Sequence, residues 1–480
     1  MKVEAKKRMD LILWVISTFF IFATLLLHSP WRDEGQAIML AQDATGFWDL
    51  IQRIRWEGHP MLWFLIAKAA GPSITPLIHG LIAVLTNAII VFKSKWPAWM
   101  RWTLPFSFYF VFEYAVISRD YAIGVLLLFT AISLWKGKHR NRMNGAFILL
   151  LLATQANFFS ALLAGVLGLL MLLENPKDKN WYWRIPLALF VLIFTAYQLT
   201  PPETGGFASE RSFDFDKLQH ATQMFTGGTL LPVYLTPSTP AISILFFTNG
   251  ISLLVALSLL SFMTLTLRKV SHQIAFAIVS FVILLFCSIV LVGFARHLGH
   301  IWIFYLLLLF VESREGTEIR PTILLKVLVA GQLVGGLTHL VFEYITPYSE
   351  SRGMADYLEN KNIPAERTAV FPAGYGAGIS LLSGEAYYQP DMDTSMTHII
   401  WNPDSQADYY PKDVLRRLFE RYQEGEVYLI TPINMTYENA RSINPWKPIL
   451  QPEEINTHSE SGFAESFHLY KIQLDSLSKP

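Results

Sequence analysis

An acidic pair, Asp33-Glu34, follows the first hydrophobic segment of the chain and opens a loop that closes with Glu57-Gly58-His59-Pro60. Carboxylates are costly inside hydrocarbon, so a pair beside an apolar segment needs a watery cavity or a compensating role. One carboxylate in such a place can take the proton of an acceptor hydroxyl, if it lies within hydrogen-bond reach. A plainer interpretation is that Ser29-Pro30 starts a helix through Asp43, whose dipole favours acids in its first turn.

Two further motifs place ionisable side chains next to apolar segments. Glu57 and His59 lie in a turn before a helix, where Gly and Pro need no functional explanation. His59 could alternatively orient the acidic pair or contact a phosphate. Arg119-Asp120 stands between two apolar runs; it is either an arginine that reaches to the surface beside its counter-ion or part of the same site.

Three basic or titratable residues, Arg296, His297 and His300, fall in what we expect to be a short outer loop. The positive-inside rule disfavours cations there. A guanidinium group suits phosphate oxygens through forked hydrogen bonds, so an outer arginine at the membrane surface indicates a lipid-phosphate partner. The two histidines have the spacing of metal ligands on one helix face, but no cysteine or third ligand is close in sequence.

Composition defines the class of protein. Of the 480 residues, 52% are hydrophobic and only 16% are charged, and apolar runs of about 17 to 25 residues recur from residue 11 to residue 345. The chain is therefore predicted to be a mainly α-helical, polytopic membrane protein. Its net charge of zero gives no general attraction to nucleic acid. The single cysteine, Cys287, excludes an intramolecular disulfide.

Basic clusters predict the orientation, because short loops rich in Lys and Arg stay in the cytoplasm. Such clusters occur at 2–8, 93–101, 136–142, 177–184, 268–269 and 314–320. All of them can lie inside if Met61 to Ala70 forms a short surface or re-entrant helix. About eleven crossings follow, with the amino terminus in the cytoplasm as an uncleaved signal anchor and the carboxyl terminus outside. The predicted spans are 11–28, 74–92, 102–118, 121–135, 143–156, 158–173, 185–201, 241–266, 272–293, 301–313 and 321–345.

This topology gives two domains. Residues 1–345 form the membrane domain, whose outer loop 29–60 carries the acidic pair, and residues 346–480 form a polar extracytoplasmic domain. In the latter, 354–360 and 412–422 have helical spacing, while 368–371, 427–430 and 467–472 are typical of short strands, which predicts a small α/β domain. The segment from about 202 to 240, rich in Pro, Thr and Gly, is expected to be an outer loop.

Three motifs resemble those of the GT-C membrane glycosyltransferases, in particular the family 39-like protein O-mannosyltransferases and lipid A aminoarabinose transferases. The matching residues are Trp31-Arg32-Asp33-Glu34, Glu57-Gly58-His59-Pro60-Met61-Leu62 and Ser118-Arg119-Asp120-Tyr121. The resemblance covers residues 1–345 in layout and is motif-specific over about 29–62 and 113–135. Met61 stands where the family usually has a second proline, and the outer domain lacks the repeats of eukaryotic mannosyltransferases.

The resemblance implies transfer of a sugar from a polyprenyl-phosphate donor to an acceptor hydroxyl on the outer face of a bacterial inner membrane. Asp33 would be the base for an inverting displacement, with Glu34 beside it. Arg119 or Arg296 would stabilise the departing lipid phosphate. We expect no metal or other cofactor. The sugar, and whether the acceptor is a protein, lipid or glycan, stay open.

Two other functions compete with this hypothesis. A transporter or lipid flippase would also have many spans, but its polar site usually lies near the bilayer midplane in paired, interrupted helices. Here the ionisable residues gather at one boundary, and only the helix break near Asn157 favours the transporter. A non-catalytic envelope assembly partner would have the same fold, and substitution of Asp33 would leave its function unchanged.

Overall fold

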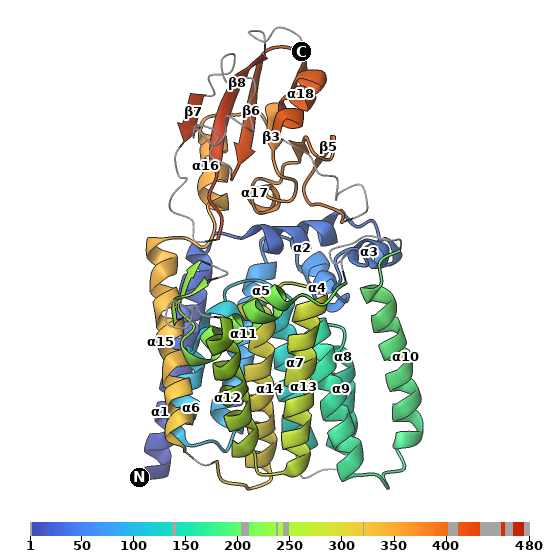
Figure 1. The fold of residues 1–480 in the computed structure, drawn as a ribbon, viewed down its shortest axis with the longest axis vertical. Coiled ribbons are helices and arrows are strands. Elements are labelled where there is room, and N and C mark those ends of the chain that lie inside the picture. The colour runs from blue at the N-terminus through green and yellow to red at the C-terminus, as the bar shows by residue number, and fades with distance from the viewer. Residues whose placement is uncertain are drawn as a thin grey trace.

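Long apolar helices stand side by side in one half of the molecule, and a domain built on a mixed β-sheet caps one end of them (Figure 1). The amino terminus lies at the far end of the helices and the carboxyl terminus in the cap. The computed structural model describes residues 2–136, 141–202, 211–236, 239–242, 249–319, 321–401, 411–432, 453–456 and 464–474.

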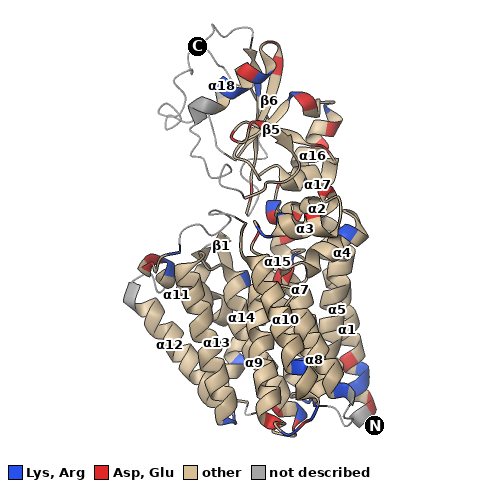
Figure 2. Ribbon diagram, turned by 90° about the vertical axis from the view of Figure 1, so that its right-hand side faces the viewer, with Lys and Arg blue, Asp and Glu red and all other residues tan. Residues whose placement is uncertain are grey.

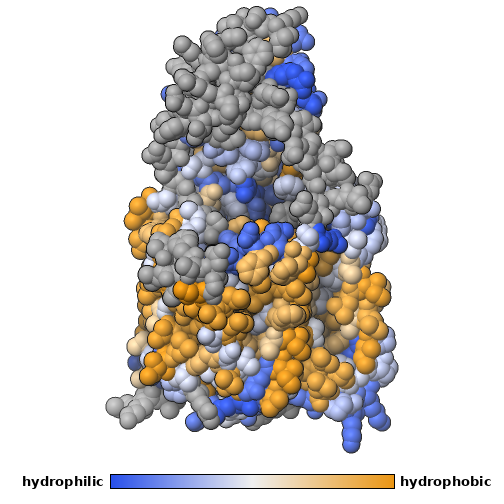
Figure 3. All heavy atoms as spheres, in the orientation of Figure 1, coloured by the Kyte–Doolittle hydropathy of each residue, from blue (hydrophilic) through white to orange (hydrophobic). Residues whose placement is uncertain are grey.

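The bundle helices in the described part of the chain correspond to ten of the eleven predicted spans. They are α1 (Lys2–Leu27), α5 (Thr75–Lys93), α7 (Tyr121–Trp135), α8 (Asn141–Ala153), α9 (Phe158–Glu174), α10 (Trp181–Leu199), α12 (Asn249–Thr266), α13 (Val270–Ile289), α14 (Ala295–Arg314) and α15 (Ile323–Ile345). Among the described residues, six helices are long and apolar enough to cross a membrane and four are shorter. Their outward side chains form the apolar band of Figure 3. The predicted class, a mainly α-helical polytopic membrane protein, is confirmed.

Helix α14 forms the centre of the bundle. Nearly all of its side chains are buried, and it is longer than the predicted 301–313. At the end of α14 away from the cap, Glu312 accepts hydrogen bonds from the backbone of Arg268 and Lys269 and contacts His272 Nδ1 at 3.0 Å. This carboxylate therefore caps the turn that leads into α13 and keeps its charge partnered.

The predicted basic clusters gather at the end of the bundle opposite the cap (Figure 2). Lys136 and Lys269 each pair with both Glu174 and Glu315, which joins four separate helix ends. Residues 137–140 and 320 of these clusters lie outside the described part of the chain. A single basic end is what the positive-inside rule requires of a consistent topology.

Two predicted segments differ in the structure. The span 102–118 is not a continuous helix: α6 (Ala98–Thr103) passes into the 3₁₀ turn η1 (Leu104–Phe106) and one turn of π-helix, η2 (Tyr109–Glu113). Pro105 cannot donate the hydrogen bond that a regular helix needs there. The predicted outer loop 202–240 contains a helix, α11 (Phe215–Leu230), which packs on α12, α13, α14 and α15. The short strands β1 (Tyr234–Thr236) and β2 (Thr239–Pro240) follow it.

Three short helices lie between the bundle and the cap (Figure 1). They are α2 (Arg32–Asp43), α3 (Phe47–Ile54) and α4 (Leu62–Ala70). The last is the predicted short helix at 61–70. Phe47 and Trp48 of α3 are exposed at this level, where aromatic side chains suit the interface between lipid and water.

The cap contains a six-stranded sheet with the order β5-β4-β3-β6-β8-β7, in which β3 is parallel to β4 and β6 and the other pairs are antiparallel. Its elements are α16 (Ser351–Asn360), η4 (Ala365–Arg367), β3 (Thr368–Val370), α17 (Ala377–Ser383), β4 (Tyr387–Gln389), β5 (Thr394–Met396), α18 (Pro411–Tyr422), β6 (Glu426–Thr431), β7 (Glu453–Asn456) and β8 (His468–Gln473). The predicted small α/β domain is confirmed, with three strands and one helix that the sequence did not reveal. We call this cap the outer domain.

Candidate active site

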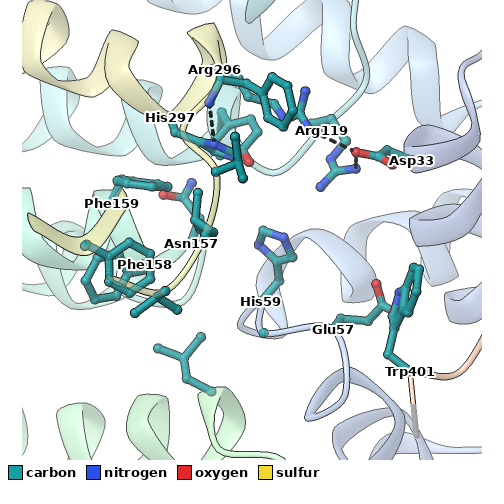
Figure 4. Close-up of a pocket in the computed structure, with 18 of the residues that line it drawn as sticks. Asp33, Glu57, His59, Arg119, Asn157, Phe158, Phe159, Arg296, His297 and Trp401 are labelled. Carbon is teal, nitrogen blue, oxygen red and sulfur yellow. Dashed lines mark hydrogen bonds and ion pairs between the residues drawn. The ribbon is translucent and has the colours of Figure 1, made fainter. Parts of the chain in front are cut away.

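A cavity of about 760 Å³ opens at the level where the bundle meets the outer domain. Its polar side carries Asp33, Glu57, His59, Arg119 and Arg296, and its opposite side is aromatic and aliphatic (Figure 4). The apolar lining comes from the start of α9, the end of α13 and the segment between α13 and α14: Phe158, Phe159, Phe286, Val290, Leu291, Val292 and Phe294. The cavity is therefore amphipathic, with one charged wall and one apolar wall.

Asp33 occupies the second position of α2, with its carboxylate at the cavity wall. Oδ2 lies 2.9 Å from Arg119 Nη1 and 3.3 Å from Arg296 Nη2. Burial by itself raises the pKa of the Asp33 carboxyl, but the two guanidinium groups more than offset this and hold that pKa below its ordinary value. Asp33 is thus ionised, and two arginines from distant parts of the chain converge on it.

The second acid of the pair points elsewhere. Glu34 is buried and lies outside the cavity lining. Its carboxylate accepts hydrogen bonds from the backbone of Trp31 and Ser118 and contacts His28 Nε2 at 2.9 Å. His28 in turn contacts Glu343 at 2.9 Å. Glu34 therefore caps α2 and connects it to Ser118, to the end of α1 and, through His28, to α15. Its role is to hold α2 in position.

Glu57 lies on the cavity wall between α3 and α4, next to His59 (Figure 4). Burial raises the pKa of its carboxyl to about 7, although a hydrogen bond from Gln36 and the nearby His59 and Arg119 oppose this. Gln36 Nε2 donates to Glu57 Oε1 over 2.8 Å. A carboxylate of this kind exchanges protons near neutral pH, which a general base requires.

The remaining predicted residues divide between the lining and the layer behind it. His59 lines the cavity and its Nδ1 lies 2.8 Å from Asp120 Oδ2, which is buried behind it. His297 lines the cavity, but its Nδ1 accepts the Phe294 amide and so caps α14. His300 is fully buried behind the lining, with Nδ1 3.0 Å from the Arg296 carbonyl oxygen. The described residues contain no group of three or more His, Cys, Asp or Glu that could hold a metal ion.

Sequence reasoning missed several lining residues. Gln36 stands one helical turn after Asp33, so its place on the same face of α2 was detectable from spacing. Asn157, at the predicted helix break, caps α9 by accepting the Ser160 amide and also lines the cavity. Trp401 belongs to the outer domain and has no signal in the local sequence. Three further cations line the same cavity: Arg55, Arg211 and Lys217.

These features define an integral membrane protein with an amphipathic cavity between its bundle and its outer domain. No family model and no curated protein matches the sequence. Among solved structures, the chain is similar to ArnT from Cupriavidus metallidurans bound to undecaprenyl phosphate, with 11% identity and a TM-score of 0.49 over 96% of this chain and 97% of that one. ArnT is a GT-C lipid A aminoarabinose transferase, one of the groups that the sequence motifs resemble. At this identity and TM-score, the likeness carries no information about substrate or mechanism.

Proposed function

We propose that this protein is a glycosyltransferase that moves a sugar from a polyprenyl-phosphate donor to an acceptor hydroxyl at the outer face of a bacterial inner membrane. The amphipathic cavity carries the proposal. A polyprenyl-phosphate sugar has an apolar chain, one anionic phosphate and a polar sugar. The apolar wall suits the chain, and the converging guanidinium groups of Arg119 and Arg296 suit the phosphate.

In the reaction that we propose, the acceptor oxygen attacks the anomeric carbon while the bond from that carbon to the phosphate oxygen breaks. The bonding electrons leave with the lipid phosphate, and the acceptor proton passes to a carboxylate. A single displacement of this kind inverts the anomeric configuration. Arg119 and Arg296 would stabilise the charge that develops on the leaving phosphate, a contribution that positioned donors make without reorganisation.

Asp33 is the base in this proposal, and its arginine partners explain how its basicity would be controlled. While both guanidinium groups bind the carboxylate, its pKa stays low and it is a weak base. A donor phosphate in the cavity competes for the same two arginines. Asp33 would then lose its partners and become more basic when the donor is in place, so activation would follow donor binding.

Two features support this function over transport. The charged residues that line the cavity lie at one boundary of the bundle, whereas transporter sites usually lie near the midplane. The helix break at Asn157, which favoured a transporter in the sequence, lines the same boundary cavity. We also propose that no metal is required, because the two arginines can neutralise a monophosphate leaving group.

The test is sugar transfer by the purified protein in detergent. Mass spectrometry of the copurifying lipid should identify a polyprenyl phosphate, and a panel of polyprenyl-phosphate sugars should contain a donor that supports transfer. Asp33→Asn should lower turnover by about 10² to 10⁴-fold with little change in melting temperature. Turnover should persist in EDTA. Wild-type turnover by Asp33→Asn would remove this residue from catalysis, and loss of activity in EDTA that a divalent ion restores would refute the metal-free account.

A further inference from the structure

The outer domain contacts α2, the helix that carries Asp33, at its start, its middle and its end. At the start of α2, Arg32 lies 3.4 Å from Glu465 and its guanidinium covers the ring of Tyr375 at 4.2 Å. One turn further on, Gly35 packs so closely against α17 that a side chain there would collide with the Ala377 carbonyl. The position of α2 is therefore set from above by the outer domain as well as from below by the bundle.

The side chain of Gln36 makes the most specific contact between the two domains. Its Oε1 accepts the Ile399 amide over 2.9 Å, and its Nε2 donates to the Ile399 carbonyl over 2.6 Å. The same Nε2 donates to Glu57. Gln36 is buried, so all three partners are held in an environment where an unmade hydrogen bond is costly. One amide thus fixes a segment of the outer domain and a cavity carboxylate relative to each other.

The outer-domain segment 397–401 is fixed at a second point. Thr397 Oγ1 donates to Asp43 Oδ2 over 2.6 Å, and His398 Nδ1 lies 3.1 Å from the same oxygen. Asp43 ends α2, so the segment is attached to the middle and to the end of one helix. Trp401, which follows, lines the cavity with its side chain next to Glu57 (Figure 4).

An indole ring beside a carboxylate matches the chemistry of a sugar. A pyranose or furanose ring presents C–H groups on one face, which an aromatic face with its negative quadrupole attracts. Its hydroxyl groups at the edge donate hydrogen bonds to a carboxylate. Sites of this kind combine aromatic surface with a few well-placed polar groups. The flat face comes from Trp401 and the acceptor oxygens come from Glu57.

We propose that the outer domain supplies the sugar-binding wall of the cavity: Trp401 is the platform, Glu57 binds sugar hydroxyls, and Gln36 is the positioning residue that holds the two together. The proposal rests on the glycosyltransferase function above and names the part of the site that recognises the sugar. It gives the outer domain a direct part in substrate binding and makes Gln36 a residue that acts through its neighbours.

Calorimetric titration in detergent tests the wall with two probes, decaprenyl phosphate and decaprenyl phosphate esterified to one of several hexoses or pentoses. The wild type should bind at least one ester more tightly than the bare phosphate. Trp401→Ala and Gln36→Leu should each weaken that ester about tenfold, the equivalent of about 1.4 kcal/mol, and change the bare phosphate less than about twofold. Trp401→Phe keeps an aromatic face and should recover most of the affinity. Trp48→Ala, which removes an exposed tryptophan outside the cavity lining, is the matched control.

The Michaelis constant for methyl glycosides as soluble acceptors distinguishes the two sugars that could use the wall. A raised constant in Trp401→Ala, with unchanged ester affinity, assigns the wall to the acceptor sugar. Equal losses for ester and bare phosphate, or no change in either measurement, would overturn the proposal. A wild-type protein that fails to bind decaprenyl phosphate at all would instead refute the proposed function, so the two failures are distinct.

Discussion

Asp33→Asn should strengthen the binding of a lipid phosphate while it abolishes sugar transfer. In the structure, the Asp33 carboxylate occupies the two guanidinium groups that the proposed donor phosphate needs. An asparagine keeps the shape of the side chain and gives up its charge. The phosphate then no longer has to displace a carboxylate from the two arginines. The repulsion between two anions in one cavity also disappears.

The size of the effect follows from the two distances. At a dielectric constant near 80, charges separated by the observed 2.9 and 3.3 Å attract by about 1.3 to 1.4 kcal/mol each. The two contacts together therefore give a Coulomb attraction of about 2.7 kcal/mol in this medium, and desolvation and screening by salt lower the net value. Because about 1.4 kcal/mol corresponds to a tenfold change, the dissociation constant of decaprenyl phosphate should fall by about 10- to 100-fold.

The assay is calorimetric titration of decaprenyl phosphate into purified wild type and variant at low salt, repeated at higher salt to confirm an electrostatic origin. Asp49→Asn is the matched control, because it removes an aspartate that pairs with Arg53 at 3.1 Å on α3, outside the cavity lining. It should leave the affinity unchanged. Unchanged or weaker binding by Asp33→Asn would refute the competition between carboxylate and phosphate, whatever happens to turnover.

Three other measurements test separate parts of the structure. A decaprenyl phosphate monomethyl ester, whose phosphodiester charge is constant and which carries no sugar for Glu57 to bind, should bind more tightly as pH falls through about 7, since protonation of Glu57 removes a negative charge from the cavity. Glu57→Gln should show the tight affinity at every pH, and a retained pH dependence would exclude this residue as its source. Gly35→Ala should lower the free energy of unfolding by about 1 to 3 kcal/mol, because the new methyl group would overlap the Ala377 carbonyl of the outer domain. Gly165→Ala, which has open space around it, is the control and should be nearly neutral. Thermal unfolding measures both. In a variant with Cys287→Ala and Glu385→Cys, an impermeant maleimide should label intact cells, and labelling only after lysis would contradict an extracytoplasmic outer domain.

The bundle was predictable because its signals are local. Runs of apolar residues long enough to cross a bilayer, and basic clusters between them, do not depend on what packs against them. The strands β3, β6 and β8 were predictable for a similar reason, since each is a run of β-forming residues bounded by polar ones. Helix α11 was missed because its Gly, Thr and Gln content resembles a loop, although Asp214 before it caps the helix by accepting two backbone amides.

The sequence predicted only part of the candidate site. The sequence by itself determined which residue types stand at the outer boundary, because charge is excluded from the apolar runs on either side. It did not determine what each charge contacts. Glu34 and Asp33 are neighbours with the same chemistry, yet the turn of α2 directs one into a buried contact with His28 and the other into the cavity.

Tertiary structure alone decided the partners. Arg119 and Arg296 meet at Asp33 because three separate segments pack together, and Gln36 reaches Ile399 because the outer domain folds back onto α2. Hydrogen bonds and ion pairs depend on distances of about 3 Å, and such distances between residues far apart in the chain are set by the packing of whole helices and sheets. No local pattern of residues encodes them, so the sequence located the charged boundary, and the fold selected which of its residues face the cavity together.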